Sequence, residues 1–137
     1  MDILRKEFIQ KLKAVFDKDL NKTWLTVEYL AQNVFNTHVR SLNRQCHEYL
    51  GRPMQQVIIR SRVWLAVRLI KSDPYLILAT LHESVGYKKR ASLEGVFEEY
   101  KGIRMEKYAG LCAQNPGEAF LKLLKNEADE KCPVCGR

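Results

Sequence analysis

The sequence lacks the segments that would place a protein in a membrane or lead it across one. No apolar run in its 137 residues approaches the roughly 20 residues that span a bilayer. Its first residues, Met1-Asp2-Ile3-Leu4-Arg5-Lys6-Glu7, include acidic groups and lack the apolar core of a signal peptide. We therefore expect a cytoplasmic protein with no membrane partner.

Patterns of common catalytic centres are also missing. The chain has no paired carboxylates in a pocket pattern, no glycine-rich phosphate loop and no serine, histidine and aspartate arranged for nucleophilic catalysis. It has only four cysteines, and one of them, Cys46, falls inside a helical pattern, which does not suit a disulfide framework. These absences predict a protein that binds and is not an enzyme, with its thiols reduced.

Positive charge is in excess and is unevenly distributed. The formal net charge is +7, and because residues 111–137 sum to zero, the whole excess lies within residues 1–110. Such a balance fits binding to nucleic acid, to an anionic membrane or to an acidic partner, as well as mere solubility. A hydrophobic content of 46% is enough to build a core at this length, so the basic part is expected to fold.

Apolar residues recur at helical spacing along the chain, which predicts an all-α fold. The predicted helices cover residues 2–17, 27–34, 38–50, 54–71, 76–84, 90–101 and 118–129. Thr26 is expected to cap the second helix and Asn36 or Thr37 the third, while Gly51 and Gly102 are expected to end helices. This order predicts two helix–turn–helix units about 50 residues apart, joined by one apolar helix.

The helix predicted over residues 38–50 has two faces of different chemistry. The expected buried stripe consists of Val39, Leu42, Cys46 and Tyr49. The opposite face carries Arg40, Asn43, Arg44 and His47. Arginine binds O6 and N7 of guanine, and asparagine binds N6 and N7 of adenine, so this face is predicted to read bases in a major groove. A solvated helix face is the alternative interpretation.

The second unit has a weaker pattern of the same kind. Its long helix has an expected buried stripe of Leu93, Phe97 and Tyr100. The preceding turn presents Lys88, Lys89 and Arg90, which suit phosphate contacts. Glu94 and Gly95 follow on the helix itself, and neither side chain favours contact with DNA. We predict that this second helix is a poor reader of bases.

Arg62 is an exception in the apolar joining helix. Its stem is expected to pack between the two units and its head to pair with an acid or a carbonyl, because buried polar groups are normally satisfied. Trp64, on the same helix, is expected in the core.

Taken together, these patterns resemble the DNA-binding domain of the AraC/XylS family of bacterial transcription activators, over about residues 8–109. The resemblance rests on Leu42-Asn43-Arg44, Gly51, Arg62, Ala66, Leu69, Ile70, Val85-Gly86-Tyr87, Leu93, Phe97, Gly102 and Tyr108. Three features depart from it. Met105 stands where the family usually has proline, and the first turn is one residue longer than usual between Ala31 and Leu42. Glu94 and Gly95 stand where the family usually has polar or arginine side chains that help hold DNA.

The resemblance implies that the second helix of each unit enters a major groove and that the joining helix sets the two readers ~34 Å apart. The implied DNA contacts are Thr37, Arg40, Asn43, Arg44, His47, Lys88, Lys89, Arg90 and Ser92. The implied function is a stand-alone transcription regulator, an activator at the bacterial nucleoid without an effector-sensing domain. Double-stranded DNA is its expected partner, with RNA polymerase as a further candidate.

The expected organisation has four parts. Residues 1–52 form the first helix–turn–helix subdomain, 53–72 the linker helix, 73–110 the second subdomain, and 111–137 a C-terminal helix and a CxxC tail. A rival interpretation keeps this fold but assigns it to protein interaction. In that case specific DNA binding is lost, and the C-terminal helix and tail dock on a partner or on a second copy.

The tail pair Cys132 and Cys135, in a CPxCG pattern, matches half of a tetrahedral zinc site. Cys112 is one candidate third ligand, and the same pair of a second chain is another. A disulfide between chains, redox sensing and a tail that binds nothing are the alternatives. Zinc is thus the one cofactor that the sequence suggests.

Overall fold

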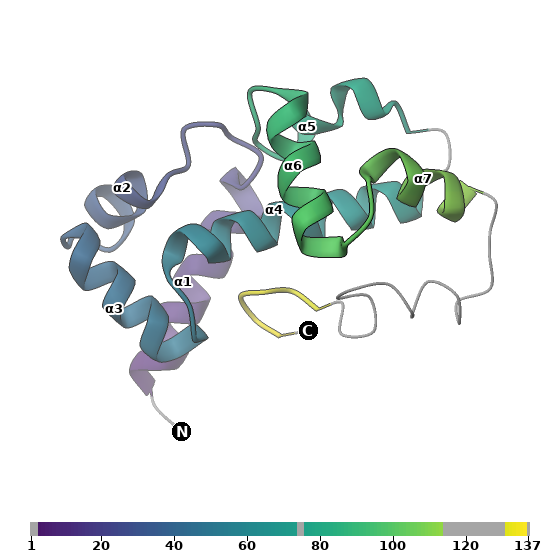
Figure 1. The fold of residues 1–137 in the computed structure, drawn as a ribbon. Coiled ribbons are helices and arrows are strands. Elements are labelled where there is room, and N and C mark those ends of the chain that lie inside the picture. The colour runs from purple at the N-terminus through teal and green to yellow at the C-terminus, as the bar shows by residue number, and fades with distance from the viewer. Residues whose placement is uncertain (1–2, 74–75, 114–130, 137) are drawn as a thin grey trace.

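The computed structural model describes residues 3–73, 76–113 and 131–136, and every regular element within them is a helix (Figure 1). The elements are α1 (Ile3–Asp19), α2 (Val27–Tyr29), the π-helix η1 (Leu30–Val34), α3 (Val39–Leu50), α4 (Met54–Ser72), the 3-10 helix η2 (Leu78–Thr80), α5 (Leu81–Ser84), α6 (Arg90–Lys101) and α7 (Met105–Ala113). The predicted all-α class is confirmed. The helix predicted over residues 118–129 lies outside the described residues.

The long helix α4 is shared by two helix–turn–helix units (Figure 1). Its first half packs with α1, α2 and α3, and its second half packs with α5, α6 and α7. Two separate apolar cores result: Val57 and Ile58 belong to the first, whereas Val63, Ala66 and Val67 belong to the second. The predicted architecture of two units joined by a linker helix is confirmed. Within the described residues, no helix is both long enough and apolar enough to cross a membrane.

The first helix–turn–helix unit has one residue more than the family pattern between Ala31 and Leu42, and the structure shows how this residue is accommodated. Thr26 begins α2 as predicted, because its Oγ1 accepts a hydrogen bond from the backbone N–H of Tyr29 at 3.2 Å. The helix then widens, and the N–H of Phe35 donates to the carbonyl of Leu30 at 2.9 Å, a π-type bond. A π turn contains one residue more than an α turn. The longer connection is therefore absorbed inside the helix and α3 keeps its place.

The predicted cap of α3 was wrong. His38, not Asn36 or Thr37, is the residue that precedes the helix, and its side chain makes no capping hydrogen bond. Asn36 instead adopts a left-handed backbone with φ of 49°, and the N–H of Thr37 donates to the carbonyl of Ala31 at 2.8 Å. Both residues thus form the turn itself. Asparagine is among the few residues that tolerate this conformation.

The helix α7 was not predicted. It begins at Met105, the position where the resembling family usually has proline. Proline is favoured at the first position of a helix, since its missing N–H has no helical partner there. Met105 therefore occupies an equivalent place in the fold, and Tyr108 of the same helix is completely buried in the second core.

The predicted buried stripe of α6 is correct for Leu93 and Phe97 but wrong for its last member. Lys101 is completely buried, whereas Tyr100 is only half-buried. The ammonium of Lys101 lies 5.5 Å from the centre of the Tyr108 ring. An aromatic face attracts a cation, which helps a lysine to occupy an apolar site.

Arg62 of α4 connects the two units, and we call its contacts the Arg62 joint. Its guanidinium donates to the backbone carbonyls of Leu20, Lys22 and Leu25 in the first unit, at 3.2, 2.9 and 3.2 Å. The ring of Tyr87 in the second unit lies 5.3 Å from the guanidinium carbon. Burial lowers the pKa of Arg62, and the tyrosine opposes this shift. The predicted structural role is confirmed, with carbonyls as the partners.

Candidate DNA interface

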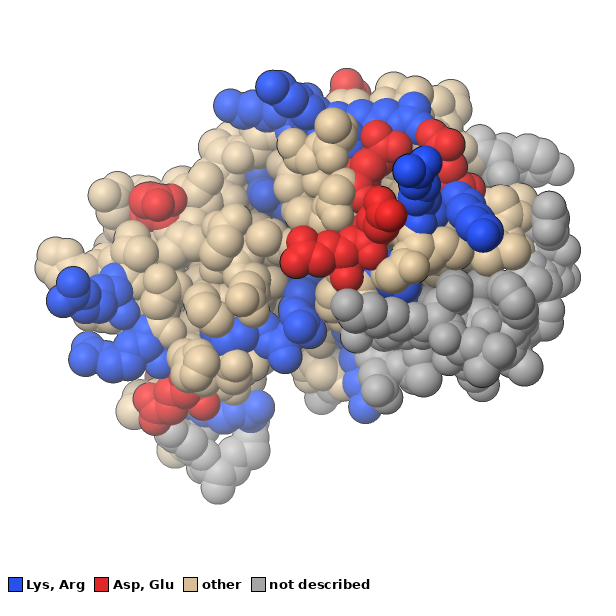
Figure 2. Space-filling view, viewed as in Figure 1, with Lys and Arg blue, Asp and Glu red and all other residues tan. Residues whose placement is uncertain are grey.

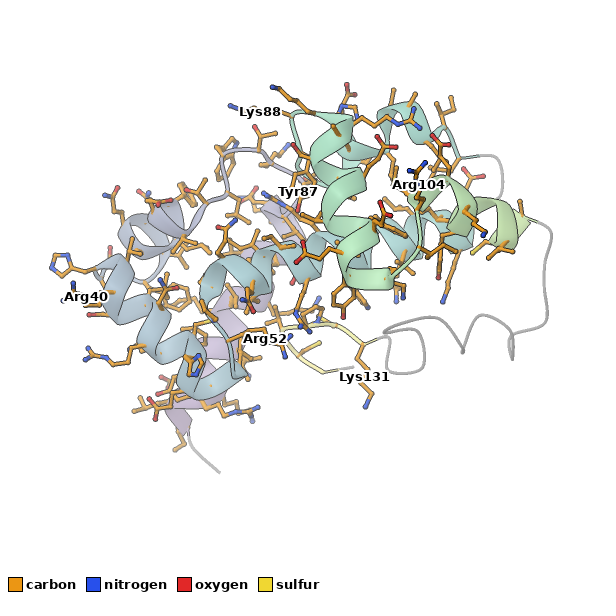
Figure 3. All side chains as sticks on the ribbon, viewed as in Figure 1. Arg40, Arg52, Tyr87, Lys88, Arg104 and Lys131 are labelled. Carbon is orange, nitrogen blue, oxygen red and sulfur yellow. The ribbon has the colours of Figure 1, made fainter. Side chains whose placement is uncertain are left out.

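Three basic side chains lie on the outer face of α3. Arg40, Arg44 and His47 are exposed, while Leu42 and Cys46 on the opposite face are completely buried. Figure 3 shows Arg40 pointing away from the body of the protein. Within the part of the chain that the structure describes, Arg40 and Arg44 form no hydrogen bond or ion pair. Their donors therefore face outward from a fixed helix.

Asn43 differs from these neighbours because its side chain is engaged inside the protein. Its Oδ1 accepts a hydrogen bond from the backbone N–H of Met54, the first residue of α4, at 3.0 Å. The first backbone N–H groups of a helix have no acceptor within the helix. The side chain of Asn43 supplies the acceptor for one of them, the N–H of Met54. Recognition of adenine uses both the oxygen and the nitrogen of the amide. Here the oxygen joins α3 to α4.

The helices α3 and α6 occupy equivalent positions in the two units. Each has twelve residues, and each ends at a left-handed glycine, Gly51 with φ of 78° and Gly102 with φ of 74°. This register pairs Leu42 with Leu93 and Cys46 with Phe97, all of them completely buried. The outward positions held in α3 by Arg40, Arg44 and His47 are held in α6 by Ala91, Gly95 and Glu98. At these three positions α6 offers DNA no donor.

The outer surface of the second unit is divided by charge. Figure 2 shows acidic side chains gathered over α6 and α7, and the residues concerned are Glu94, Glu98, Glu99 and Glu106. Lys88 and Lys89 lie exposed in the turn before α6, and Figure 3 places Lys88 at the edge of the molecule. Lys88 and Lys89 thus place positive charge at the turn, while the face of α6 itself is acidic.

Arg90, predicted to contact phosphate, is half-buried and paired within the protein. Its guanidinium lies 2.6 Å from a carboxylate oxygen of Glu106 and 3.5 Å from one of Glu94. Two acids therefore already neutralise its charge. Sequence spacing is consistent with the Arg90–Glu94 pair, four residues apart on one helix, but not with the Glu106 pair, because Glu106 belongs to the unpredicted helix α7.

Gly95→Ala is expected to raise the free energy of unfolding by about 0.5–1 kcal/mol. Glycine in a helix interior leaves the unfolded chain more conformational freedom than alanine does, and a Cβ at Gly95 would meet nothing within 4 Å. Urea unfolding of the two proteins measures the difference. A loss of stability would contradict the open space outside α6.

The C-terminal tail packs on the first unit. Cys132 and Val134 are only 6% and 3% exposed, and with Phe16 of α1 and Trp64 of α4 they line a cavity of about 400 Å³. Trp64, expected in the core, is half-buried and packs against the edge of the first core. Cys112 packs against the second core instead. Among the described residues, no three His, Cys, Asp or Glu side chains form a metal-binding group.

These features define a protein of two helix–turn–helix units on a shared helix, with one basic and one acidic outer helix. No family model matches the chain, and no curated protein sequence does. Several solved structures share its fold, including the three that follow. The C-terminal domain of AraT, a response regulator from Geobacillus stearothermophilus, is 22% identical with a TM-score of 0.68, over 74% of this chain and 83% of that one.

The other two structures agree with the first. The C-terminal domain of the two-component response regulator yesN from Fusobacterium nucleatum is 20% identical with a TM-score of 0.67, over 76% of this chain and 96% of that one. A protein of unknown function from Listeria innocua is 16% identical with a TM-score of 0.66, over 75% and 95%. This likeness confirms the fold that the resemblance to the AraC/XylS DNA-binding domain implied.

Proposed function

We propose that the protein is a transcription regulator that binds double-stranded DNA and reads one major groove with α3. The observation that carries the proposal is the pair Arg40 and Arg44, exposed and unpaired within the described residues on a helix whose other face is buried. A guanidinium at such a position reaches O6 and N7 of guanine through two hydrogen bonds. His47, one turn further along, is assigned to phosphate. The response-regulator domains with the same fold support a regulatory role.

The second unit is proposed to hold the DNA backbone without reading bases. Lys88 and Lys89 supply phosphate contacts, which position a protein on DNA but carry no sequence information. Ala91 and Gly95 give no base contact, and Glu98 repels phosphate. The specific site is therefore expected to be one asymmetric half-site. The family resemblance implied that one helix of each unit reads bases, and the proposal limits base reading to α3.

Four other implied contacts are assigned as follows. Asn43 and Arg90 position α3 and α6, respectively, because both side chains are engaged within the protein. Thr37, half-buried in the first turn, and Ser92, exposed on α6, are retained as candidate phosphate contacts.

The wider expectations also belong to this proposal. We infer a protein that binds without catalysis, in the cytoplasm, at the nucleoid. The change from the first core to the second between Ile58 and Val63 of α4 supports two subdomains that share residues 53–72 as a linker, whereas the proposed boundary between 110 and 111 falls inside α7. Activation, with RNA polymerase as partner, is retained from the family resemblance.

Arg44→Ala is expected to weaken binding to the specific site by about 1–3 kcal/mol, or about 5- to 150-fold. The site is first selected from a random duplex library at two salt concentrations, since the non-specific contribution falls steeply with salt. Fluorescence anisotropy then gives the affinity of each variant for the selected and for a scrambled duplex. The loss should be confined to the selected duplex, because Arg44 is proposed to contact bases.

Lys88→Ala provides the matched control. It should weaken binding to both duplexes equally and reduce the salt dependence by about one phosphate contact. If no sequence is enriched and all binding vanishes at the higher salt, the rival function in protein interaction is supported instead.

A further inference from the structure

We propose that the tail residues Cys132 and Cys135 form half of a tetrahedral zinc site and that a second copy of the chain supplies the other half. Each copy contributes two thiolates, so one zinc ion joins two chains. The site goes beyond the proposed DNA-binding function and does not depend on it.

The backbone of the tail already has the form of a compact turn that carries both thiols. Residues 133–135 form a turn, and the N–H of Gly136 donates to the carbonyl of Cys132 at 2.9 Å. Gly136 has φ of 75°, a left-handed backbone that glycine adopts without strain. This hydrogen bond joins residues four positions apart, so it brings Cys132 and Gly136, the two ends of the turn, close together. Two thiolates at this spacing bind one edge of a tetrahedral ion.

The turn is fixed on a rigid surface and not left in solvent. Cys132 and Val134 are buried against the first core, and Cys135 lies half-buried at its edge. Figure 1 shows this segment below α4, on the side of α1 and away from the end of α7. Apolar surroundings of this kind exclude water from a metal site and strengthen its bonds. The turn is thus ordered before any ion arrives, which lowers the entropic cost of binding.

Lys13 of α1 supplies a positive charge beside the pair. It lines the same cavity as Cys132, and its ammonium is paired with the carboxylate of Asp17. Zinc with four thiolates has a net charge of about −2. In a symmetric pair of chains, the two Lys13 ammonium groups would offset part of this charge, since each is also paired with Asp17.

The remaining two ligands must come from outside the described part of one chain. Its other two thiols lie elsewhere: Cys46 is completely buried, with its pKa raised by burial to about 11, and Cys112 packs against the second core. The described residues contain no group of three metal-binding side chains. A second copy related by a two-fold axis presents the same pair of thiols and completes four ligands.

The experiment adds zinc chloride to the reduced full-length protein after removal of metal with a chelator. Elemental analysis gives the zinc content, and sedimentation velocity gives the mass. We expect one zinc ion for two chains and a mass of twice 16.0 kDa. Cys132→Ser and Cys135→Ser should each abolish both the bound zinc and the dimer, whereas Cys112→Ser should retain both.

Circular dichroism of each variant establishes that its helices are intact, so that lost zinc is not the result of unfolding. Cobalt chloride used in place of zinc should give the absorption of a tetrahedral thiolate complex. Three results would overturn the proposal: no retained zinc, one zinc ion in a monomer, or a dimer that persists in chelator. Because no DNA is present, the outcome is independent of the proposed regulatory function.

Discussion

Arg62→Ala is expected to lower the free energy of unfolding by about 3–5 kcal/mol, from the carbonyls left unsatisfied and the packing lost. The wild-type guanidinium satisfies the carbonyls of Leu20, Lys22 and Leu25, all within 3.2 Å of its nitrogen atoms. Alanine leaves the carbonyls of Leu20 and Leu25 without this donor, while that of Lys22 keeps the N–H of Leu25, and it opens a void beneath the ring of Tyr87. A buried polar group that loses its partner incurs its full desolvation cost. Urea denaturation followed by circular dichroism measures the change.

Arg60→Ala is the matched control on the same helix. Arg60 is half-buried, and its guanidinium carbon lies 5.1 Å from the ring centre of Tyr100, a contact worth about 0.5–1 kcal/mol. Arg62→Lys should recover only part of the loss, since an ammonium does not reproduce the planar fork that spans three carbonyls. A loss below about 1 kcal/mol for Arg62→Ala would show that the Arg62 joint is not a main source of stability.

Gly86→Ala is expected to cost about 3 kcal/mol, the sum of an unfavourable backbone conformation and a steric conflict. Gly86 has φ of 91°, and a Cβ there would lie 2.6 Å from the carbonyl oxygen of Leu20 and 2.7 Å from Nε of Arg62. Neither neighbour is free to move, because the two are hydrogen-bonded to each other. Alanine would therefore force the two units apart.

Gly51→Ala separates the two contributions to this loss. Gly51 also has a positive φ, 78°, but a Cβ there would meet nothing within 4 Å. Its replacement should therefore cost only the backbone part, about 1–2 kcal/mol. The difference between the two variants, measured by urea denaturation, gives the energy of close approach at the Arg62 joint. Equal losses would mean that the second unit shifts without strain.

Most of the fold could be predicted from the sequence because most helices are marked by apolar residues at helical spacing and by residues that begin or end a helix. Leu42 and Cys46 repeat at helical spacing, and Gly51 and Gly102 end α3 and α6 as predicted. The π-helix and α7 have no such signal. The first depends on a single extra residue, which a helix can absorb at several places. The second is stabilised mainly by burial of Met105 and Tyr108 against residues distant in sequence.

The sequence predicted which side chains of the candidate site are exposed. It did not predict which of them form hydrogen bonds or ion pairs with other parts of the protein. The outward position of Arg40 and Arg44 follows from the periodicity of α3. Sequence spacing gave no sign that Asn43 accepts a hydrogen bond from the start of α4. The pairing of Arg90 with Glu106 likewise depends on the packing of two helices. Such pairings are tertiary events, and they separate positioning residues from those available to DNA.

The Arg62 joint also has a thermodynamic consequence for DNA binding. Its hydrogen bonds lie inside the protein, where dissolved ions screen them far less than they screen contacts with phosphate. Because these contacts join the two units, the second unit loses its freedom to rotate relative to the first when the chain folds, before the protein binds DNA. In the proposed complex, α3 in its groove would bring Lys88 and Lys89 to the DNA backbone at a high effective concentration. Raising the salt concentration should thus loosen the grip on DNA while leaving the distance between the two units unchanged.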